Sequence, residues 1–136
     1  MGDIITRTAQ YAIRAVVYLA ETCDGGRLTV AQVAQGTGVP RNYLSKVLNV
    51  LVQEGILDST RGPHGGFRLV RPATKIVLAE VSAPFADIPT GPCPLSPRAC
   101  PHGRDCPCRE ECRALSDSIA HFLTTTSIDH LTTRSD

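Results

Sequence analysis

Hydrophobic positions follow helical spacing over the first part of the chain. Between about Ile5 and Glu21, apolar residues return every three or four positions and so share one face of a helix. These positions are Ala9, Ala12, Ile13, Val16, Leu19 and Ala20. The CDGG stretch at residues 23–26 ends the pattern. The sequence therefore predicts an amphipathic N-terminal helix.

Two further helices follow, joined by a tight turn. Thr29 and Gln32 have the spacing of a capping box, which predicts a short helix that Gly36 and Gly38 close. Residues 41–53 then show helical spacing of apolar side chains once more. Those side chains are Leu44, Val47, Leu48 and Leu51. Two helices joined by a glycine-bearing turn predict a helix-turn-helix.

A glycine-rich turn separates two short segments of β character. The predicted strands are residues 56–60 and 67–70, and the RGPHGG stretch lies between them. Gly65 and Gly66 can take the positive backbone angles that a hairpin requires. We therefore expect a β-hairpin wing beside the helix-turn-helix.

The second half of the chain alternates between helical and irregular patterns. Residues 78–86 have a helical pattern that Pro84 interrupts, and residues 89–107 are too rich in Pro, Gly and Cys for regular structure. The last strong helix is expected from about Arg109 to Thr124, with one further turn at residues 127–131. Its apolar stripe comprises Leu115, Ile119, Phe122 and Leu123. Such a stripe suits either a core or a partner helix.

These patterns predict a mainly α fold with a small β-hairpin wing. Residues 1–75 form the winged helix-turn-helix, and residues 76–136 form a cysteine-rich loop and a C-terminal helix. With 136 residues and 42% hydrophobic composition, the chain can build one ordinary core, so we expect one compact domain overall.

The charge of the chain is unevenly distributed. The net charge is only +1, but residues 1–75 hold nine Lys and Arg against five Asp and Glu, and residues 76–136 hold five against eight. A basic half is where nucleic acid is expected to bind, although a solvated surface is the alternative. No export signal and no apolar run long enough for a bilayer are evident, which predicts a cytoplasmic protein without membrane contact.

The predicted helix at residues 41–53 carries the side chains that reading a major groove requires. Arg and Lys can pair with guanine, Asn with adenine, and Tyr and Ser with phosphate. The predicted DNA-binding residues are Arg41, Asn42, Tyr43, Ser45 and Lys46 on this helix, and Arg61 and His64 in the wing. The wing residues suit the backbone or the minor groove. The alternative is that Tyr43 and Lys46 merely cover an exposed helix surface.

Five of the six cysteines fall between Cys93 and Cys112. Thiolates gather either as disulfides in an oxidising compartment or as ligands of zinc or an iron–sulfur cluster in a reducing one. The size of the chain favours the second reason, because its core does not need disulfides. Spacing alone leaves zinc and iron–sulfur open. A thiol enzyme using Cys106 and Cys108 is disfavoured, since no CxxC begins a helix, and we predict that the protein is not an enzyme.

Long segments of the chain resemble one family of bacterial regulators. ITRTAQYAIRAVVYLA, VPRNYLSKVLNVLVQEGIL and STRGPHGGFRLVRP, together with the downstream cysteines, resemble the Rrf2 family of winged-helix transcription regulators. The likeness covers nearly the whole chain. It implies a homodimer that binds a roughly palindromic double-stranded DNA operator, with the two recognition helices, one from each subunit, in successive major grooves. It also implies that the last long helix is the dimer contact.

The resemblance also implies the ligands of an iron–sulfur cluster, of either 2Fe-2S or 4Fe-4S type. Cys93, Cys100 and Cys106 match the three family cysteines, with a first gap one residue longer than usual. At the positions of the family's fourth ligands the chain has Gln10 and Arg109, which are not ordinary iron ligands. The local candidates for the fourth ligand are Cys108, His102, Glu110 and Cys112.

We predict Cys108 as the fourth ligand, because it lies at the edge of the loop. Cys112 fits better as a small buried hydrophobe and His102 as a solvated loop residue. The complete hypothesis is a transcription repressor whose operator affinity depends on a cluster that senses iron, oxidants or nitric oxide. The alternative is a winged-helix regulator with a structural zinc site and no redox sensing.

Overall fold

The computed structural model describes residues 6–22, 26–63, 65–85 and 107–132. In chain order its main elements are α1 (Arg7–Thr22), α2 (Val30–Thr37), α3 (Arg41–Gln53), β1 (Leu57–Thr60), β2 (Gly66–Leu69), α4 (Leu78–Ser82) and α5 (Arg109–Thr125). Short 3₁₀ helices occupy Ala73–Lys75, Ala83–Phe85 and Ile128–Leu131. The predicted mainly α fold with a β-hairpin wing is confirmed.

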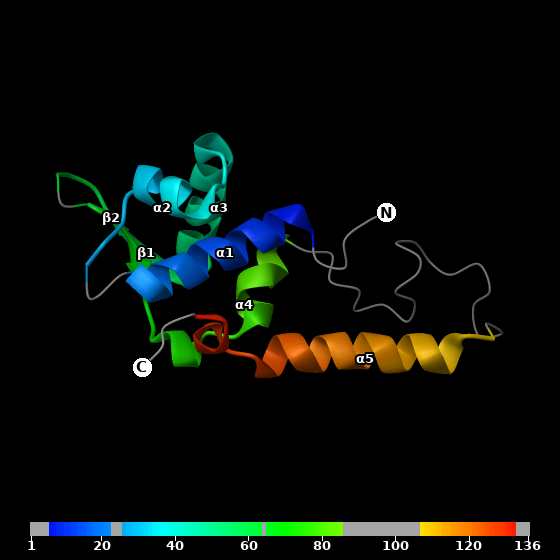
Figure 1. Cartoon of the computed structure of the whole chain (residues 1–136). Coiled ribbons are helices and arrows are strands. Elements are labelled where there is room, and N and C mark those ends of the chain that lie inside the picture. Colours follow the sequence, from blue (N-terminus) through cyan, green and yellow to red (C-terminus); the bar gives the residue numbers. More distant parts are fainter. Residues whose placement is uncertain (1–5, 23–25, 64, 86–106, 133–136) are drawn as a thin grey trace.

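Helix α1 is the central element of the core. It contacts α2, α3 and α4, and Figure 1 shows α2 and α3 above it and α5 below it. Its buried side chains are Ala9, Ala12, Ala15, Val16 and Leu19. Three of these are alanines, whose small side chains let neighbouring helices approach closely. The predicted helical face is therefore the buried one, with Ile13 and Ala20 at its edges.

The ends of α2 follow from local hydrogen bonds. The Thr29 hydroxyl accepts from the Gln32 amide at 3.2 Å, and the Gln32 side chain accepts from the Thr29 amide at 2.8 Å, which confirms the capping box. Gly38 ends the helix with a φ of 76°. The prediction that Gly36 helps to close the helix is wrong, because Gly36 lies inside α2. A Cβ there would come within 2.1 Å of the Tyr18 ring, so this glycine permits the close packing of α1 and α2.

Strands β1 and β2 form the antiparallel wing, in a register that pairs Leu57 with Leu69 and Thr60 with Gly66. Gly66 has the positive φ that was expected, whereas at the other end of the turn Gly62, not Gly65, has one. A bridge between Leu28 and Phe67, with hydrogen bonds of 3.0 and 2.7 Å, attaches the wing to the chain that precedes α2. The wing is thus paired on one side to the rest of the fold.

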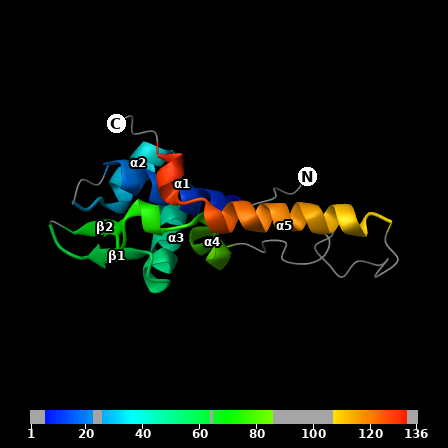
Figure 2. The same ribbon diagram turned by 90° about the horizontal axis from the view of Figure 1, so that it is seen from below.

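The C-terminal helix α5 joins the rest of the fold at its C-terminal end. The Leu78 amide donates to the Thr126 carbonyl at 2.9 Å, and the Ile128 amide donates to the Ile76 carbonyl at 2.8 Å. From this attachment α5 extends away from the other elements, as Figures 1 and 2 show from two directions. The predicted turn after α5 is confirmed by the 3₁₀ helix Ile128–Leu131.

The apolar stripe of α5 is only partly covered. Leu123 is buried and Ile119 packs against the core, but Leu115 and Phe122 are 49% and 51% exposed. The stripe therefore serves the core at one end of the helix and leaves an apolar surface along the rest. No helix among the described residues has the length and apolar character needed to cross a bilayer.

Candidate nucleic-acid interface

Helix α3 has one buried face and one outer face. Leu44, Val47, Leu48 and Leu51 are buried against the core and fix the orientation of the helix. The predicted DNA-binding side chains lie on the other face, where Arg41, Asn42, Tyr43 and Lys46 are exposed and Ser45 is half-buried. The structure thus brings these five residues together on one surface of α3.

Asn49 belongs to the same surface and was missed by the sequence analysis. It is exposed, and it follows Asn42 by seven residues, which is two turns of a helix. This spacing was the signal that could have identified it. An amide side chain at this place can hydrogen-bond to a base edge or to a phosphate.

Tyr43 has contacts that its neighbours on the outer face of α3 do not share. Its hydroxyl and the Thr8 hydroxyl of α1 share a hydrogen bond. Its ring meets the Tyr11 ring edge to face, with 5.4 Å between centroids and 85° between planes. The side chain is nevertheless 41% exposed. Tyr43 therefore connects the first turn of α3 to the first two turns of α1.

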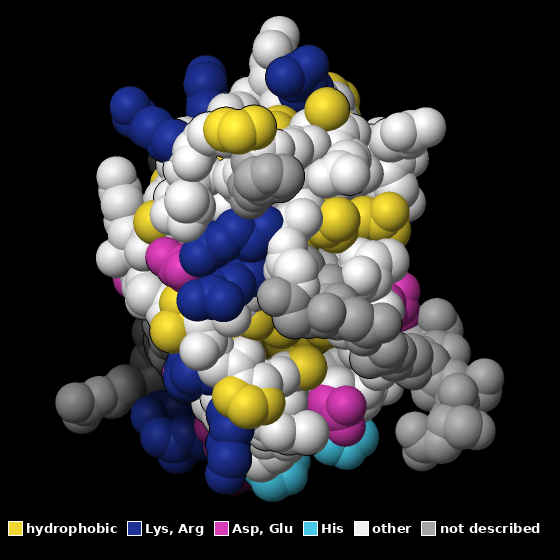
Figure 3. Space-filling model, turned by 90° about the vertical axis from the view of Figure 1, so that its left-hand side faces the viewer, with side chains coloured by type: hydrophobic (Ala, Val, Ile, Leu, Met, Phe, Trp, Pro, Cys, Tyr) yellow, Lys and Arg dark blue, Asp and Glu magenta, His cyan; other side chains and the backbone are white. Residues whose placement is uncertain are grey.

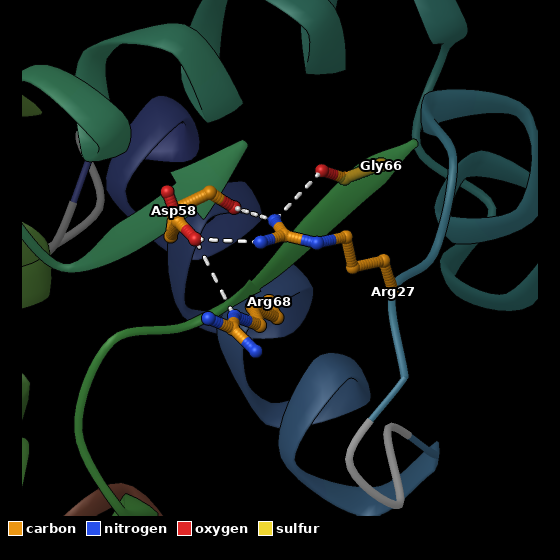
Figure 4. A network of polar contacts seen from close by, with 4 residues as sticks. All are labelled: Arg27, Asp58, Gly66 and Arg68. Atoms are coloured by element: carbon orange, nitrogen blue, oxygen red, sulfur yellow. Dashed lines mark hydrogen bonds and ion pairs between the residues drawn. The ribbon is translucent and has the colours of Figure 1, made fainter. Parts of the chain in front are cut away.

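A polar network holds the base of the wing, as Figure 4 shows. Arg27 lies just before α2 and donates to an Asp58 carboxylate oxygen at 2.7 Å, to the Asp58 carbonyl at 3.3 Å and to the Gly66 carbonyl at 3.5 Å. Arg68, opposite Asp58 in the hairpin, reaches the same carboxylate oxygen at 3.4 Å. The sequence analysis missed this network, because Arg27 and Asp58 are 31 residues apart.

The network also affects protonation. The hydrogen bond from Arg27 is the main cause that holds the pKa of Asp58 below its ordinary value. Burial opposes this effect, while the charges of Arg27 and Arg68 add to it. Asp58 is therefore ionised at neutral pH and pairs both with Arg27, which precedes α2, and with Arg68 of β2.

The cations of this part of the molecule fall into two groups. Among the described residues, the ion pairs join Arg27 and Arg68 to Asp58 and Arg71 to Glu80. The exposed cations of α3 and of the wing turn, Arg41, Lys46 and Arg61, take part in none of these pairs. Figure 3 shows the molecule from the side of the wing, with Lys and Arg side chains spread over this face. Exposed cations outside the ion pairs of the described residues thus include three on α3 and the wing turn, and others lie elsewhere on the surface, such as Arg14 on α1 and Lys75.

Several predicted site residues lie outside the described residues. They are His64, Cys93, Cys100, His102 and Cys106. The described residues contain no group of three or more His, Cys, Asp or Glu side chains that could hold a metal. The geometry of the predicted metal site is therefore not part of the described structure.

Cys108 and Cys112 are described and differ from each other. Cys108 is exposed and immediately precedes α5, at the end of the cysteine-rich stretch. Cys112 follows one turn later on α5 and is buried, which agrees with its interpretation as a small hydrophobic side chain. Of the two thiols, Cys108 is thus the accessible one, while Glu110 is exposed beside it.

The comparisons with known proteins agree with the fold. A family model described as "Rrf2: Iron-dependent Transcriptional regulator" matches residues 5–134. The structure of CymR (YrzC), the global cysteine regulator of B. subtilis, is 21% identical with a TM-score of 0.77, over 97% of this chain and 98% of that chain.

Two further solved structures are similar. IscR of T. potens is 20% identical with a TM-score of 0.72, over 93% of this chain and 84% of that chain. CymR of Staphylococcus aureus is 20% identical with a TM-score of 0.72, over 96% and 99% of the two chains. At these identities the likeness establishes the shared fold.

Proposed function

Because the chain belongs to the Rrf2 family of transcriptional regulators, we propose that it is a repressor that binds a double-stranded DNA operator as a homodimer. Helix α3 enters the major groove, and the wing lies against the sugar–phosphate backbone. The observation that supports this most directly is that Arg41, Asn42 and Lys46 lie exposed on the outer face of α3, whose other face is buried in the core. Arg41, Lys46 and Arg61 are outside the ion pairs of the described residues, so phosphates and bases can neutralise them.

We assign two kinds of DNA contact to the side chains of α3: contacts that recognise bases and contacts that fix the helix on the phosphate backbone. Arg41 and Asn42 lie in the first turn, where side chains reach base edges, and Arg to guanine and Asn to adenine are the expected pairs. Ser45, Lys46 and Asn49 follow along the groove and supply phosphate or base contacts. The buried leucines behind them keep this surface in place.

The wing adds backbone contacts. Arg61 is exposed at the start of the turn, and we assign it to a phosphate. His64 lies between the two strands in the sequence, and we assign it to the backbone or the minor groove. Such contacts raise affinity for any sequence and do not distinguish one operator from another.

Helix α5 is the proposed dimer contact. Leu115 and Phe122 leave about half of their surface exposed on a helix that extends from the body, so a second copy of α5 is well placed to cover them. A two-fold dimer would set its two α3 helices about 34 Å apart, the spacing of successive major grooves on one side of DNA.

We extend the proposal to an iron–sulfur cluster held by Cys93, Cys100, Cys106 and Cys108. Four thiolates are a donor set that suits such a cluster, and the exposed Cys108 thiol at the start of α5 fits the fourth position. When bound, the cluster supplies a group that reacts with oxidants and nitric oxide. Helix α5 begins directly after Cys108. Backbone hydrogen bonds just after its C-terminal end attach it to residues 76–78, which follow the wing in the sequence. The same four thiolates also suit a structural zinc ion, which is the second candidate.

Two experiments test the proposal. Duplexes selected from a random-sequence library by the purified protein should share a roughly palindromic site, and Lys46→Ala should weaken binding to it. Lys75→Ala is the matched control, because it removes an exposed positive charge from a 3₁₀ helix outside α3 and the wing. The DNA-binding proposal fails if no site is enriched.

Metal content decides between the two cofactors. We expect protein purified without oxygen to show visible charge-transfer absorption, with iron and sulfide in matching amounts per chain. Replacement of Cys108 by Ala should lower the cluster content, while Cys112→Ala should not. Stoichiometric zinc and a colourless spectrum would instead establish the structural zinc site.

A further inference from the structure

The first turn of α3 lacks a side-chain cap. Pro40 occupies the N-cap position and makes no side-chain hydrogen bond to the helix. The first amides of a helix have no partner within the helix, and an uncapped first turn is therefore prone to fraying. Arg41 and Asn42, the proposed base readers, lie in this turn.

In place of a side-chain cap, the contacts of Tyr43 with α1 hold the first turn of α3. It is the third residue of α3, and it is held through its hydroxyl by Thr8 and through its ring by Tyr11. The two contacts act on different parts of the side chain, so they fix both its position and its orientation. Leu44, the next residue, is buried and anchors the turn from its inner side.

The end of α1 that holds Tyr43 is itself fixed. The Thr6 hydroxyl donates to the Phe85 carbonyl at 2.8 Å and accepts from the Ala9 amide at 3.2 Å. Ala9 is fully buried. The first turn of α1 is therefore capped and packed, and it can serve as a firm support for the recognition helix.

We propose that Tyr43 is a positioning residue for operator recognition, which acts through Thr8 and Tyr11 and not through a phosphate. This inference rests on the proposed DNA-binding function and replaces the phosphate contact that the residue type alone had indicated for Tyr43. The pair of hydroxyls holds the first turn of α3 against α1 at the angle that Arg41 and Asn42 need. Loss of either hydroxyl should therefore reduce discrimination between operator and random DNA.

A double-mutant cycle tests this role. Tyr43→Phe keeps the ring contact with Tyr11 but removes the hydroxyl, and Thr8→Val keeps the side-chain shape but removes its partner. Affinities are measured by fluorescence anisotropy for a duplex selected from a random library and for a random duplex, at several salt concentrations. Each single variant should lose about fivefold in operator affinity, the effect of about one hydrogen bond.

The cycle has a result that only positioning explains. The double variant should be no weaker than either single variant, because both remove the same bond. Thr8→Ser should bind the operator with wild-type affinity, because it keeps the hydroxyl. The slope of log affinity against log salt should be the same in every variant. The operator-to-random ratio should fall in the single variants.

Contrary results are equally specific. If Tyr43→Phe lowers the salt slope while Thr8→Val leaves affinity unchanged, Tyr43 contacts a phosphate and the inference is wrong. Additive losses in the double variant would also overturn it. If the wild-type protein itself selects no duplex, the proposed DNA-binding function has failed, which is a separate outcome.

Discussion

Helix α3 and the wing both carry exposed basic side chains, but different forces hold them. Helix α3 rests on four fully or almost fully buried aliphatic side chains. The wing has Leu57 and Phe67 as its buried residues and is otherwise attached by a backbone bridge and by the Arg27–Asp58–Arg68 network. Apolar packing depends little on salt or pH, whereas partly exposed ion pairs depend on both.

This difference matches the role that we propose for each element. Base reading requires that side chains keep a fixed position, and close packing provides it. A wing that contacts the backbone can follow the shape of the DNA, and a polar attachment that is 43% exposed at Asp58 allows such adjustment. We therefore expect substitutions in the core behind α3 to lower the free energy of unfolding. Substitutions around the wing should instead change how DNA binding depends on salt and how stability depends on pH.

The largest effect is expected from the core behind α3. Leu48→Ala should lower the free energy of unfolding by about 2–5 kcal/mol, because it removes a fully buried side chain and leaves a cavity. Urea unfolding followed by circular dichroism measures this loss. Asn49 follows Leu48 in the chain but lies on the exposed face of α3, so Asn49→Ala should change the free energy of unfolding by less than about 0.5 kcal/mol. Similar values for both variants would show that packing does not hold α3.

The next largest effect concerns the exposed face of α3. Arg41→Ala and Asn42→Ala should each weaken operator binding by about 1–3 kcal/mol, since each removes a base contact. Titration of the selected duplex by fluorescence anisotropy measures the change, with unfolding curves as a check that both variants are folded. An equal loss on random DNA would mean that these side chains do not read bases.

A smaller effect separates the two arginines of the wing. Arg61→Ala should reduce the slope of log affinity against log salt by about one, because one phosphate contact is lost. Arg68→Ala is the matched control in the same hairpin, since its guanidinium is already paired with Asp58. Binding isotherms from low to high salt measure both slopes. A slope for Arg61→Ala equal to that of the wild type would place Arg61 away from the phosphates.

The smallest effect is a dependence on pH. The pKa of Asp58 is lower in the folded protein than its ordinary value of about 3.9, so the unfolded chain takes up a proton first. The stabilising effect of the network is therefore complete above about pH 4 and is lost as the pH falls through the lower folded pKa.

A variant isolates this contribution. In Asp58→Asn the acidic side chain is absent, so the fall in stability between about pH 5 and pH 2 should be smaller than in the wild type. Unfolding by urea at a series of pH values measures the difference. The Leu48→Ala variant should show the wild-type pH dependence, because its defect is apolar. If the free energy of unfolding of Asp58→Asn depends on pH as that of the wild type does, the ionised network does not stabilise the wing.

The features predicted well from the sequence are those that local chemistry determines. The capping box of Thr29 and Gln32, the bounds of α3 and the break at Pro84 depend on residues close together in the chain. The outer face of α3 was predictable for the same reason, since helical spacing separates it from the buried leucines.

The features that were missed depend on residues far apart. Arg27 meets Asp58 across 31 positions, and Thr8 meets Tyr43 across 35. The role of Gly36 depends on the Tyr18 ring of another helix. No pattern within a window of the sequence records such contacts. The assignment of the cysteine ligands stays a prediction.

The attachment of α5 has a consequence for how related sequences can vary. Hydrogen bonds between residues 76–78 and 126–128 hold together the two ends of the chain segment that contains five of the six cysteines. Closing a longer loop is cheap, at about 0.6 kcal/mol for each doubling of length. A change in the length of that segment is therefore expected to cost the fold little free energy. The segment that holds these cysteines can thus vary between relatives while the core around α1 is kept.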